Sequence, residues 1–174
     1  MHQVRAHCAP DSQSAMHFVR GLCTALYDTM SMAAFLSSFR SQYRHGAFEL
    51  RLEERIDDVV RREKVPPAYG AYVISAPSVQ DREILCIGKA GTICQDGRFK
   101  SQTIRERLTK KQDGMYRHIF FRRGMETLGL ISLHFEWFVT FEENVRVLPF
   151  LAEAQLLAEF HREFNRLPRW NKAA

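Results

Sequence analysis

Two short apolar runs in the middle of the chain restrict its fold more than any other feature of the sequence. Residues 70–74 and 85–89 are each apolar and β-branched enough to form a strand. The segment between them, residues 77–83, is rich in turn-forming residues, so the two runs are predicted to pair as a β-hairpin. Tyr72 would then face Gly88 near one end of a small sheet.

The chain is long enough for one hydrophobic core. It has 174 residues, of which 45% are hydrophobic, and this predicts one compact domain with an appended segment. Pro66 and Pro67 would end any helix that precedes them. The predicted organisation is therefore an N-terminal helical extension at residues 1–67 and a compact domain at residues 68–174.

The predicted extension has two helical parts. Residues 15–39 are apolar, but Arg20 and Asp28 interrupt them, which favours an amphipathic pair of helices over a membrane span. Residues 48–64 mix apolar side chains with alternating charges, a pattern typical of a helix with one buried face. No signal peptide is evident, so a cytoplasmic protein without membrane contact is expected.

The compact domain is predicted to contain both helices and strands. After the hairpin come a helix at residues 101–112 and a long strand at residues 131–141. A last helix begins at Pro149 and ends near Asn165. The expected fold is α/β (α+β), with a small central, mostly antiparallel three-stranded sheet flanked by helices.

Charge and cysteine content narrow the class of partner. There are 25 Lys and Arg against 20 Asp and Glu, and the net charge of +5 favours a polyanionic partner, although many ordinary proteins are equally basic. The cysteines form no CxxC pair and no cluster with histidines, so they are predicted to be reduced thiols. They are Cys8, Cys23, Cys86 and Cys94.

A carboxylate interrupts the apolar stripe expected on the last helix. The stripe consists of Phe150, position 153, Leu157, Phe160 and Phe164. Glu153 occupies an inward-facing position, which is costly unless the carboxylate is paired or binds a cation. The alternative is a Glu that caps its own helix or extends out at the edge of the stripe. Glu159 and Glu163 are expected to lie off the stripe.

The helix that follows the hairpin supplies cations. Ile104 and Leu108 define its buried side, and Arg107 and Lys111 are predicted to share one flank of that side, with Arg105 on the other. An Arg at the edge of a core can donate to two phosphate oxygens at once. The alternative is an ordinary solvated helix face.

In their order along the chain these residues resemble the GIY-YIG nucleases. In that family two tripeptides on paired strands are followed by an Arg in the next helix, a His or Tyr four residues later, a Glu in a later helix and an Asn in a Pro-x-x-Asn tail. The matching parts here are Tyr72 in Gly-Ala-Tyr, Cys-Ile-Gly followed by Lys89, Arg107, Glu153 and Asn171 in Leu-Pro-Arg-Trp-Asn. The resemblance covers about 100 residues, from position 70 to position 171.

The chain departs from the family pattern at three places. Cys86 stands where the family usually has Tyr, so one hydroxyl is missing. Lys111 stands where His or Tyr is usual, and it could bind phosphate instead of activating water. The loop before Arg107 is long, which leaves Arg98 and Arg105 as rivals for the role of the arginine.

The resemblance implies a role for each matching residue. Tyr72, made acidic by nearby cations and metal, would take the proton of the attacking water as general base. Lys89 would lower the pKa of Tyr72 or hold a phosphate oxygen, and Arg107 would neutralise charge on the scissile phosphate. Glu153 would hold one Mg²⁺ (or Mn²⁺), and Asn171 would brace Glu153 or the end of the sheet.

A basic and aromatic segment at residues 115–123 is a second candidate for contact with nucleic acid. Its arginines and aromatic rings could contact phosphates and bases, or Phe120 and Phe121 could be core residues beside solvated arginines. The residues predicted to bind DNA are Arg98, Lys100, Arg105, Arg117, Arg122 and Arg123.

The chain resembles most the small stand-alone type II restriction endonucleases of the family, because no separate DNA-reading module follows the catalytic parts. The expected function is that of a Mg²⁺-dependent, sequence-specific endonuclease of a restriction-modification system. It would cut double-stranded DNA as a homodimer. Two alternatives stay open: a structure-selective repair nuclease and a non-catalytic DNA-binding relic.

Overall fold

The computed structural model describes residues 30–77, 82–100, 102–112 and 114–173. The helices are α2 (Met32–Gln42), α3 (Ile56–Arg62), α4 (Ile104–Thr109), α5 (Arg117–Leu128) and α6 (Pro149–Phe164). The long strands are β1 (Arg44–Arg51), β2 (Tyr69–Ala76), β3 (Glu83–Ala90) and β8 (Ser132–Glu142). The short strands are β4 (Thr92–Ile93), β5 (Phe99–Lys100), β6 (Lys111–Gln112), β7 (Met115–Tyr116) and β9 (Val145–Arg146).

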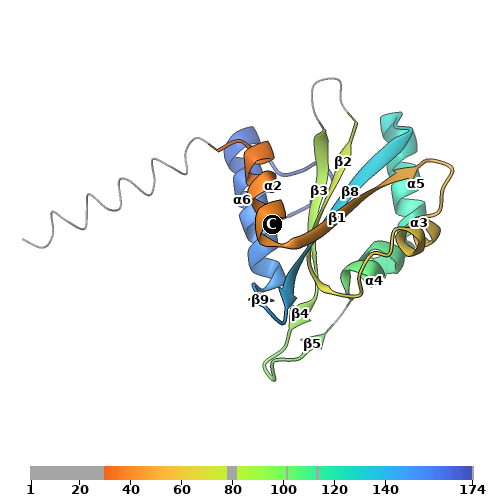
Figure 1. Ribbon diagram of the computed structural model, residues 1–174. Helices are drawn as coiled ribbons and strands as arrows, with labels where there is room; N and C mark the ends of the chain where they lie inside the picture. Colours follow the sequence, from red (N-terminus) through yellow and green to blue (C-terminus); the bar gives the residue numbers. More distant parts are fainter. Residues whose placement is uncertain (1–29, 78–81, 101, 113, 174) are drawn as a thin grey trace, which may run out of the picture.

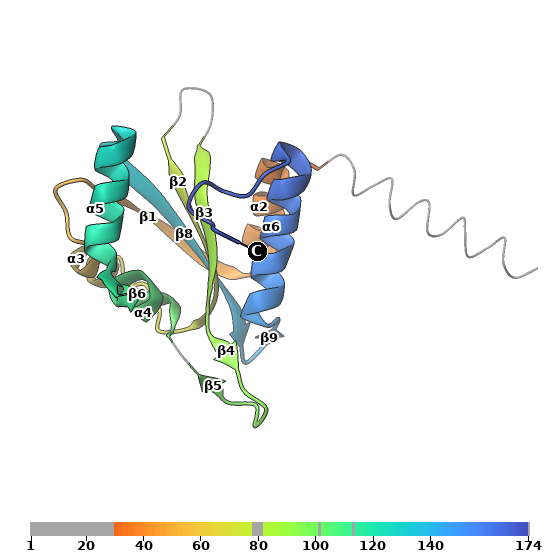
Figure 2. The ribbon, with the colours of Figure 1, turned by 180° about the vertical axis from the view of Figure 1, so that it is seen from behind.

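A central antiparallel sheet lies between two layers of helices (Figure 1). Helices α2 and α6 cover one face, and α3, α4 and α5 cover the other, as the view from behind also shows (Figure 2). The mixed α/β class and the antiparallel sheet flanked by helices are therefore confirmed. None of the helices in the described ranges combines the length and the apolar character that crossing a membrane requires.

The predicted hairpin is present. Strands β2 and β3 pair antiparallel with Tyr72 opposite Gly88 and Ala71 opposite Lys89, while residues 78–81 of the connection lie outside the described residues. The strand order is β1-β8-β2-β3, which makes β3 an edge strand and β2 a central one. Helices cover both faces of β2, and this explains why its sequence is almost continuously apolar.

The helix predicted at residues 48–64 is wrong in its first half. That region begins within β1, which pairs with β8, and Phe48 stacks on Phe135 with ring centroids 4.8 Å apart. Phe48 and Leu50 are buried while their neighbours are exposed, the period-two pattern of a strand. Within this range only α3 is helical, so the sheet has five strands, β9 included, in place of the expected three. The described part of residues 1–67 therefore shares its core with the rest of the molecule.

The other predicted elements differ mainly at their ends. Of the helices expected at residues 15–39, the part up to residue 29 lies outside the described residues, as do Cys8 and Cys23, and α2 begins at Met32. The long strand and the last helix are confirmed within one residue as β8 and α6. The helix predicted at residues 101–112 is shorter, because α4 ends at Thr109 and the chain then enters β6.

The segment at residues 115–123 is mainly the first part of α5. Phe121 is fully buried and packs edge-on against Phe135, so it is a core residue. Arg122 and Arg123 are exposed on the outer side of the same helix. Of the two alternatives for this segment, the core interpretation holds for Phe121.

Candidate active site

A cavity of about 550 Å³ lies against the edge strand β3. Because it wraps around the edge, it is lined from both faces of the sheet. The chemically active side chains that line it are Tyr72, Cys86, Arg107, Arg117, Glu153, Asn171 and Lys172. Four of the residues that the resemblance singles out, at positions 72, 107, 153 and 171, are therefore brought together by the fold.

Tyr72 lies directly over Gly88 of the neighbouring strand. Its side chain is 2% exposed, and a Cβ built on Gly88 would lie 2.5 Å from both Cζ and Oη of Tyr72. Real Cβ atoms do not approach other heavy atoms so closely. The glycine of the second tripeptide is thus needed to make room for the tyrosine of the first.

We expect the Gly88→Ala substitution to displace the Tyr72 ring and to lower the free energy of unfolding by about 1–3 kcal/mol, the usual cost of overpacking a core. Chemical denaturation of wild type, Gly88→Ala, Tyr72→Ala and the double variant measures this. Because the clash needs the ring, Gly88→Ala should cost much less in the Tyr72→Ala background. Equal costs in the two backgrounds would show that no such contact exists.

The pKa of Tyr72 is raised, contrary to the expectation that nearby cations make it acidic. Burial is the largest influence and raises the pKa, and the charges of Arg117 and Arg107 lower it only in part. Burial likewise raises the pKa of the Cys86 thiol to about 11. Both groups are therefore protonated at neutral pH in the free protein.

Arg117 is the central residue of the site, although the sequence indicated only a DNA contact. It is 5% exposed, its Nη2 donates a long hydrogen bond of 3.4 Å to the Tyr72 hydroxyl, and its Nε donates to the Arg107 carbonyl at 3.2 Å. Its guanidinium also lies 5.6 Å from the ring centroids of Phe120 and Phe121. No carboxylate among the described residues forms an ion pair with it.

One sequence signal could have revealed Arg117. Arg117, Phe121 and Met125 are the buried residues of α5, and they follow one another at intervals of four. This spacing places the arginine on the core side of the helix.

Arg107 enters the same cavity from α4. A capping box begins this helix: Glu106 N donates to Thr103 Oγ1 and Thr103 N donates to Glu106 Oε2. The Arg107 Nε atom is buried and has no hydrogen-bond partner among the described residues. A buried N–H donor without a partner destabilises the fold unless a ligand accepts its hydrogen bond.

Lys111 does not share a flank with Arg107, because α4 has ended before it. Its Nζ lies 4.3 Å from the centre of the Tyr116 ring, and it does not line the cavity. The rivals of Arg107 are also placed elsewhere: Arg105 donates from Nε to the Val65 carbonyl, and Arg98 is exposed on the β4–β5 hairpin. Of these three candidates, Arg107 is therefore the one that lies at Tyr72.

Glu153 and Lys89 form an ion pair on the opposite face of the sheet from Tyr72. Lys89 Nζ lies 2.7 Å from Glu153 Oε2, with 38% of the lysine side chain and 18% of the glutamate side chain exposed. The alternation of a strand explains this, since Tyr72 faces Gly88 while Lys89 points the other way. Lys89 therefore has no contact that would lower the pKa of Tyr72.

The buried side of α6 differs from the predicted stripe. Phe150 and Phe164 are 52% and 44% exposed, whereas Glu159 is buried and pairs with Arg162. The predicted stripe lies too far toward one side of the helix. Its positions alternate at spacings of three and four residues, an average of about 3.5 per turn, whereas an α-helix has about 3.6 residues per turn, so the two drift apart along the helix. The buried side consists of Pro149, Ala152, Leu156, Leu157, Glu159 and Phe160.

Asn171 binds the backbone of the edge strand. Its Nδ2 donates to the Ile87 carbonyl at 2.7 Å, and its Oδ1 accepts from the Ile87 N–H at 3.0 Å. Trp170 N donates to the Leu85 carbonyl at 2.8 Å, so the C-terminal tail runs along β3 as Figure 2 shows. Asn171 thus braces the end of the sheet next to Gly88, one of the two roles expected of it.

The remaining candidates for DNA contact lie outside the cavity. Lys100 belongs to the hairpin that also carries Arg98, and both are exposed. Arg122 lies 4.0 Å from Glu126 across the exposed face of α5, near Arg123. These four side chains are exposed and take no part in the site.

The donor set suits a magnesium site with one protein ligand. Among the described residues no three His, Cys, Asp or Glu side chains cluster as a metal site, and Glu153 is the carboxylate that lines the cavity. Mg²⁺ is commonly held by one or two carboxylates together with water and substrate phosphates. Glu153 fits that mode once Lys89 releases it.

Comparison of the chain with protein-family models, with curated proteins and with solved structures found no match.

Proposed function

We propose that this protein is a DNA endonuclease that hydrolyses phosphodiester bonds with a site of the GIY-YIG type. The observation that carries the proposal is the convergence of two arginines, Arg107 and Arg117, on the hydroxyl of Tyr72, neither of them paired with a carboxylate of the described residues. Arg117 is buried and Arg107 is half-buried with a buried Nε, and cations so placed are costly unless an anion binds them. A phosphodiester is the anion that bidentate arginines recognise best.

Each residue has a role in this reaction. Arg107 and Arg117 bind the non-bridging oxygens of the scissile phosphate and stabilise the charge that develops on them in the transition state. Tyr72, once deprotonated, takes the proton of the attacking water. Its raised pKa makes the phenolate scarce at neutral pH, so the rate should increase with pH. Asn171 keeps Gly88 and the edge strand in register beneath the ring.

Glu153 would hold a divalent cation at the end of the cavity opposite Tyr72. When bound, Mg²⁺ would stabilise the leaving 3′ oxygen as a Lewis acid. In the free protein Lys89 pairs with this carboxylate, and its half-buried side chain could turn toward solvent or a phosphate to leave Glu153 available as a ligand. The ion pair thus keeps the Glu153 side chain oriented before substrate binds.

The narrower proposal is a type II restriction enzyme that cuts double-stranded DNA as a homodimer. The test is incubation of purified protein with plasmid DNA and Mg²⁺, followed by sequencing of the ends. Discrete fragments with a common end sequence support a restriction enzyme. Activity confined to flaps, junctions or damaged strands points to a repair nuclease, and tight DNA binding without cutting points to a non-catalytic protein.

Glu153→Gln is expected to abolish most of the Mg²⁺-dependent cleavage, because the amide is a poorer ligand for a hard cation. Cleavage is measured against Mg²⁺ concentration, with Mn²⁺ as a second metal. The matched control is Glu143→Gln, an exposed glutamate between β8 and β9. A Glu153→Gln enzyme that cuts at the wild-type rate at every Mg²⁺ concentration would contradict the metal assignment.

A further inference from the structure

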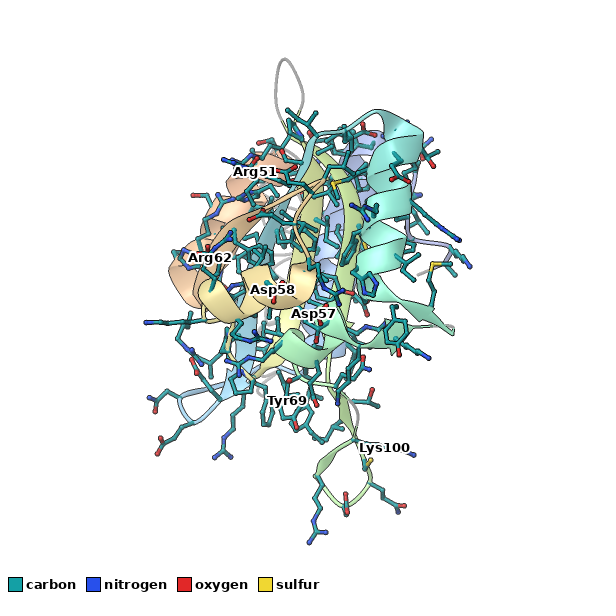
Figure 3. All side chains as sticks on the ribbon, turned by 90° about the vertical axis from the view of Figure 1, so that its right-hand side faces the viewer. Arg51, Asp57, Asp58, Arg62, Tyr69 and Lys100 are labelled. Atoms are coloured by element: carbon teal, nitrogen blue, oxygen red, sulfur yellow. The ribbon has the colours of Figure 1, made fainter. Side chains whose placement is uncertain are left out.

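A two-stranded hairpin projects from the catalytic end of the sheet. Strands β4 and β5 pair antiparallel, with Thr92 opposite Lys100 and Ile93 opposite Phe99. They extend away from both helical layers (Figure 1), and the labelled side chains of Tyr69 and Lys100 lie near the base of the hairpin in Figure 3. No part of the proposed chemistry uses this hairpin.

The base of the hairpin is fixed to the catalytic strand. Phe99 stacks on Tyr69 with ring centroids 4.1 Å apart and an angle of 11° between the rings, and it meets Phe141 edge-on at 4.7 Å. A Cβ on Gly91 would lie 2.7 Å from Tyr69 Cδ1, so the glycine lets the rings close over the connection. Tyr69 begins β2, three residues before Tyr72, and the hairpin is therefore held in position relative to the site.

The tip is also held in one conformation by its own hydrogen bonds. Cys94 N donates to the Arg98 carbonyl at 2.8 Å, and Gly97 N donates to the Cys94 carbonyl at 3.0 Å. Gly97 has a positive φ of 77°, which the turn requires, and Arg98 N donates to Asp96 Oδ1 at 3.0 Å. An ordered tip loses little conformational entropy when it binds a partner.

The side chains at the tip are polar and exposed. Gln95, Asp96 and Arg98 are all exposed, and the Arg98 side chain is 88% exposed with Asp96 3.9 Å away. A hairpin that joins two copies of a chain needs apolar anchors at its tip, which are absent from these positions. An amide, a carboxylate and a guanidinium are instead the groups that read base edges in the major groove.

We propose that this hairpin is a recognition ribbon that reads base pairs in the major groove of the DNA that the enzyme cuts, an inference that depends on the proposed endonuclease function. A two-stranded ribbon fits the width of that groove. Arg98 is assigned to a guanine, through its O6 and N7 acceptors, and Gln95 to an adenine. Lys100, nearer the base, is assigned to the phosphate backbone.

The length of the hairpin limits which base pairs it can reach. Asp96 follows Gly88 by eight residues, which at about 3.3 Å per residue is at most about 26 Å. With about 3.4 Å between successive base pairs, the bases read lie within roughly seven or eight pairs of the cut. This distance suits one half of a short recognition site in a symmetric dimer.

The test is selection of bound sequences from a random duplex library, with a cleavage-inactive Tyr72→Phe protein as the parent. Arg98→Ala in that parent is expected to lose discrimination at one guanine by about 5- to 150-fold, the equivalent of one bidentate contact. Gln95→Ala should relax a different position. The matched control is Arg146→Ala on β9, an exposed arginine that should leave every base preference unchanged.

Three results would overturn this inference alone. One is a parent that binds DNA without base preference, which leaves the endonuclease proposal intact. Another is an unchanged preference in both Arg98→Ala and Gln95→Ala. The third is a change of oligomeric state in Arg98→Ala by sedimentation, which would assign the hairpin to self-association. Base-specific binding by a wild-type protein that never cuts DNA would refute the endonuclease proposal and leave the proposed DNA-reading role of the hairpin standing. A wild-type protein that binds no DNA would refute both proposals.

Discussion

Replacing Tyr72 by Phe is expected to lower the rate of DNA cleavage by about 10²- to 10⁴-fold, the usual contribution of a general base. The phenyl ring still covers Gly88, and the hydrogen bond that Arg117 donates to the lost hydroxyl is a long one, so the fold should persist. Single-turnover cleavage measures the rate, and fluorescence anisotropy measures DNA binding, which should hardly change. An equal loss of cleavage rate and of DNA affinity would indicate that Tyr72 has a structural role only.

The pH profile separates catalysis from packing at Tyr72. Because burial raises the pKa of the phenol, the wild-type rate should increase about tenfold per pH unit above neutrality, as the phenolate fraction grows. The residual rate of Tyr72→Phe should lack that slope. Tyr43→Phe is the matched control, a buried tyrosine beyond the end of α2 that lies outside the cavity.

Arg117→Met is expected to reduce cleavage by about 10²- to 10³-fold, as removal of one donor to a developing oxyanion usually does. Met keeps the apolar contact with Phe120 and Phe121 but has no charge to offer to phosphate or to Tyr72. Folding should tolerate the change well, since the variant no longer buries a cation without a carboxylate partner. Arg117→Lys should recover part of the activity.

Two measurements distinguish this role from a structural one. NMR of ¹³Cζ-labelled tyrosine should show the pKa of Tyr72 higher in Arg117→Met than in wild type, because the guanidinium lowers it. Arg123→Met, an exposed position on the same helix, is the control and should leave both that pKa and the cleavage rate unchanged. Unaltered cleavage by Arg117→Met would remove Arg117 from the proposed site.

Features whose signals are local were predictable from the sequence. The hairpin of β2 and β3 needed only two apolar runs and a turn, and α6 needed only Pro149 and an apolar side. Strand β1 was not predicted, because the alternation of buried and exposed residues at positions 48–51 is short and runs directly into the helical pattern of the residues that follow. Its pairing with β8 joins residues more than 80 positions apart, as in Phe48 with Phe135.

The sequence by itself determined the pair of Tyr72 and Gly88, because antiparallel register places a residue of one strand opposite a residue of the next. It also determined the order of Arg107, Glu153 and Asn171 along the chain. Only the tertiary structure decided that Arg117 lies at Tyr72 and that Lys89 holds Glu153 on the other face. The physical reason is that helix packing and the two faces of a sheet bring distant residues together, and local pattern does not encode those contacts.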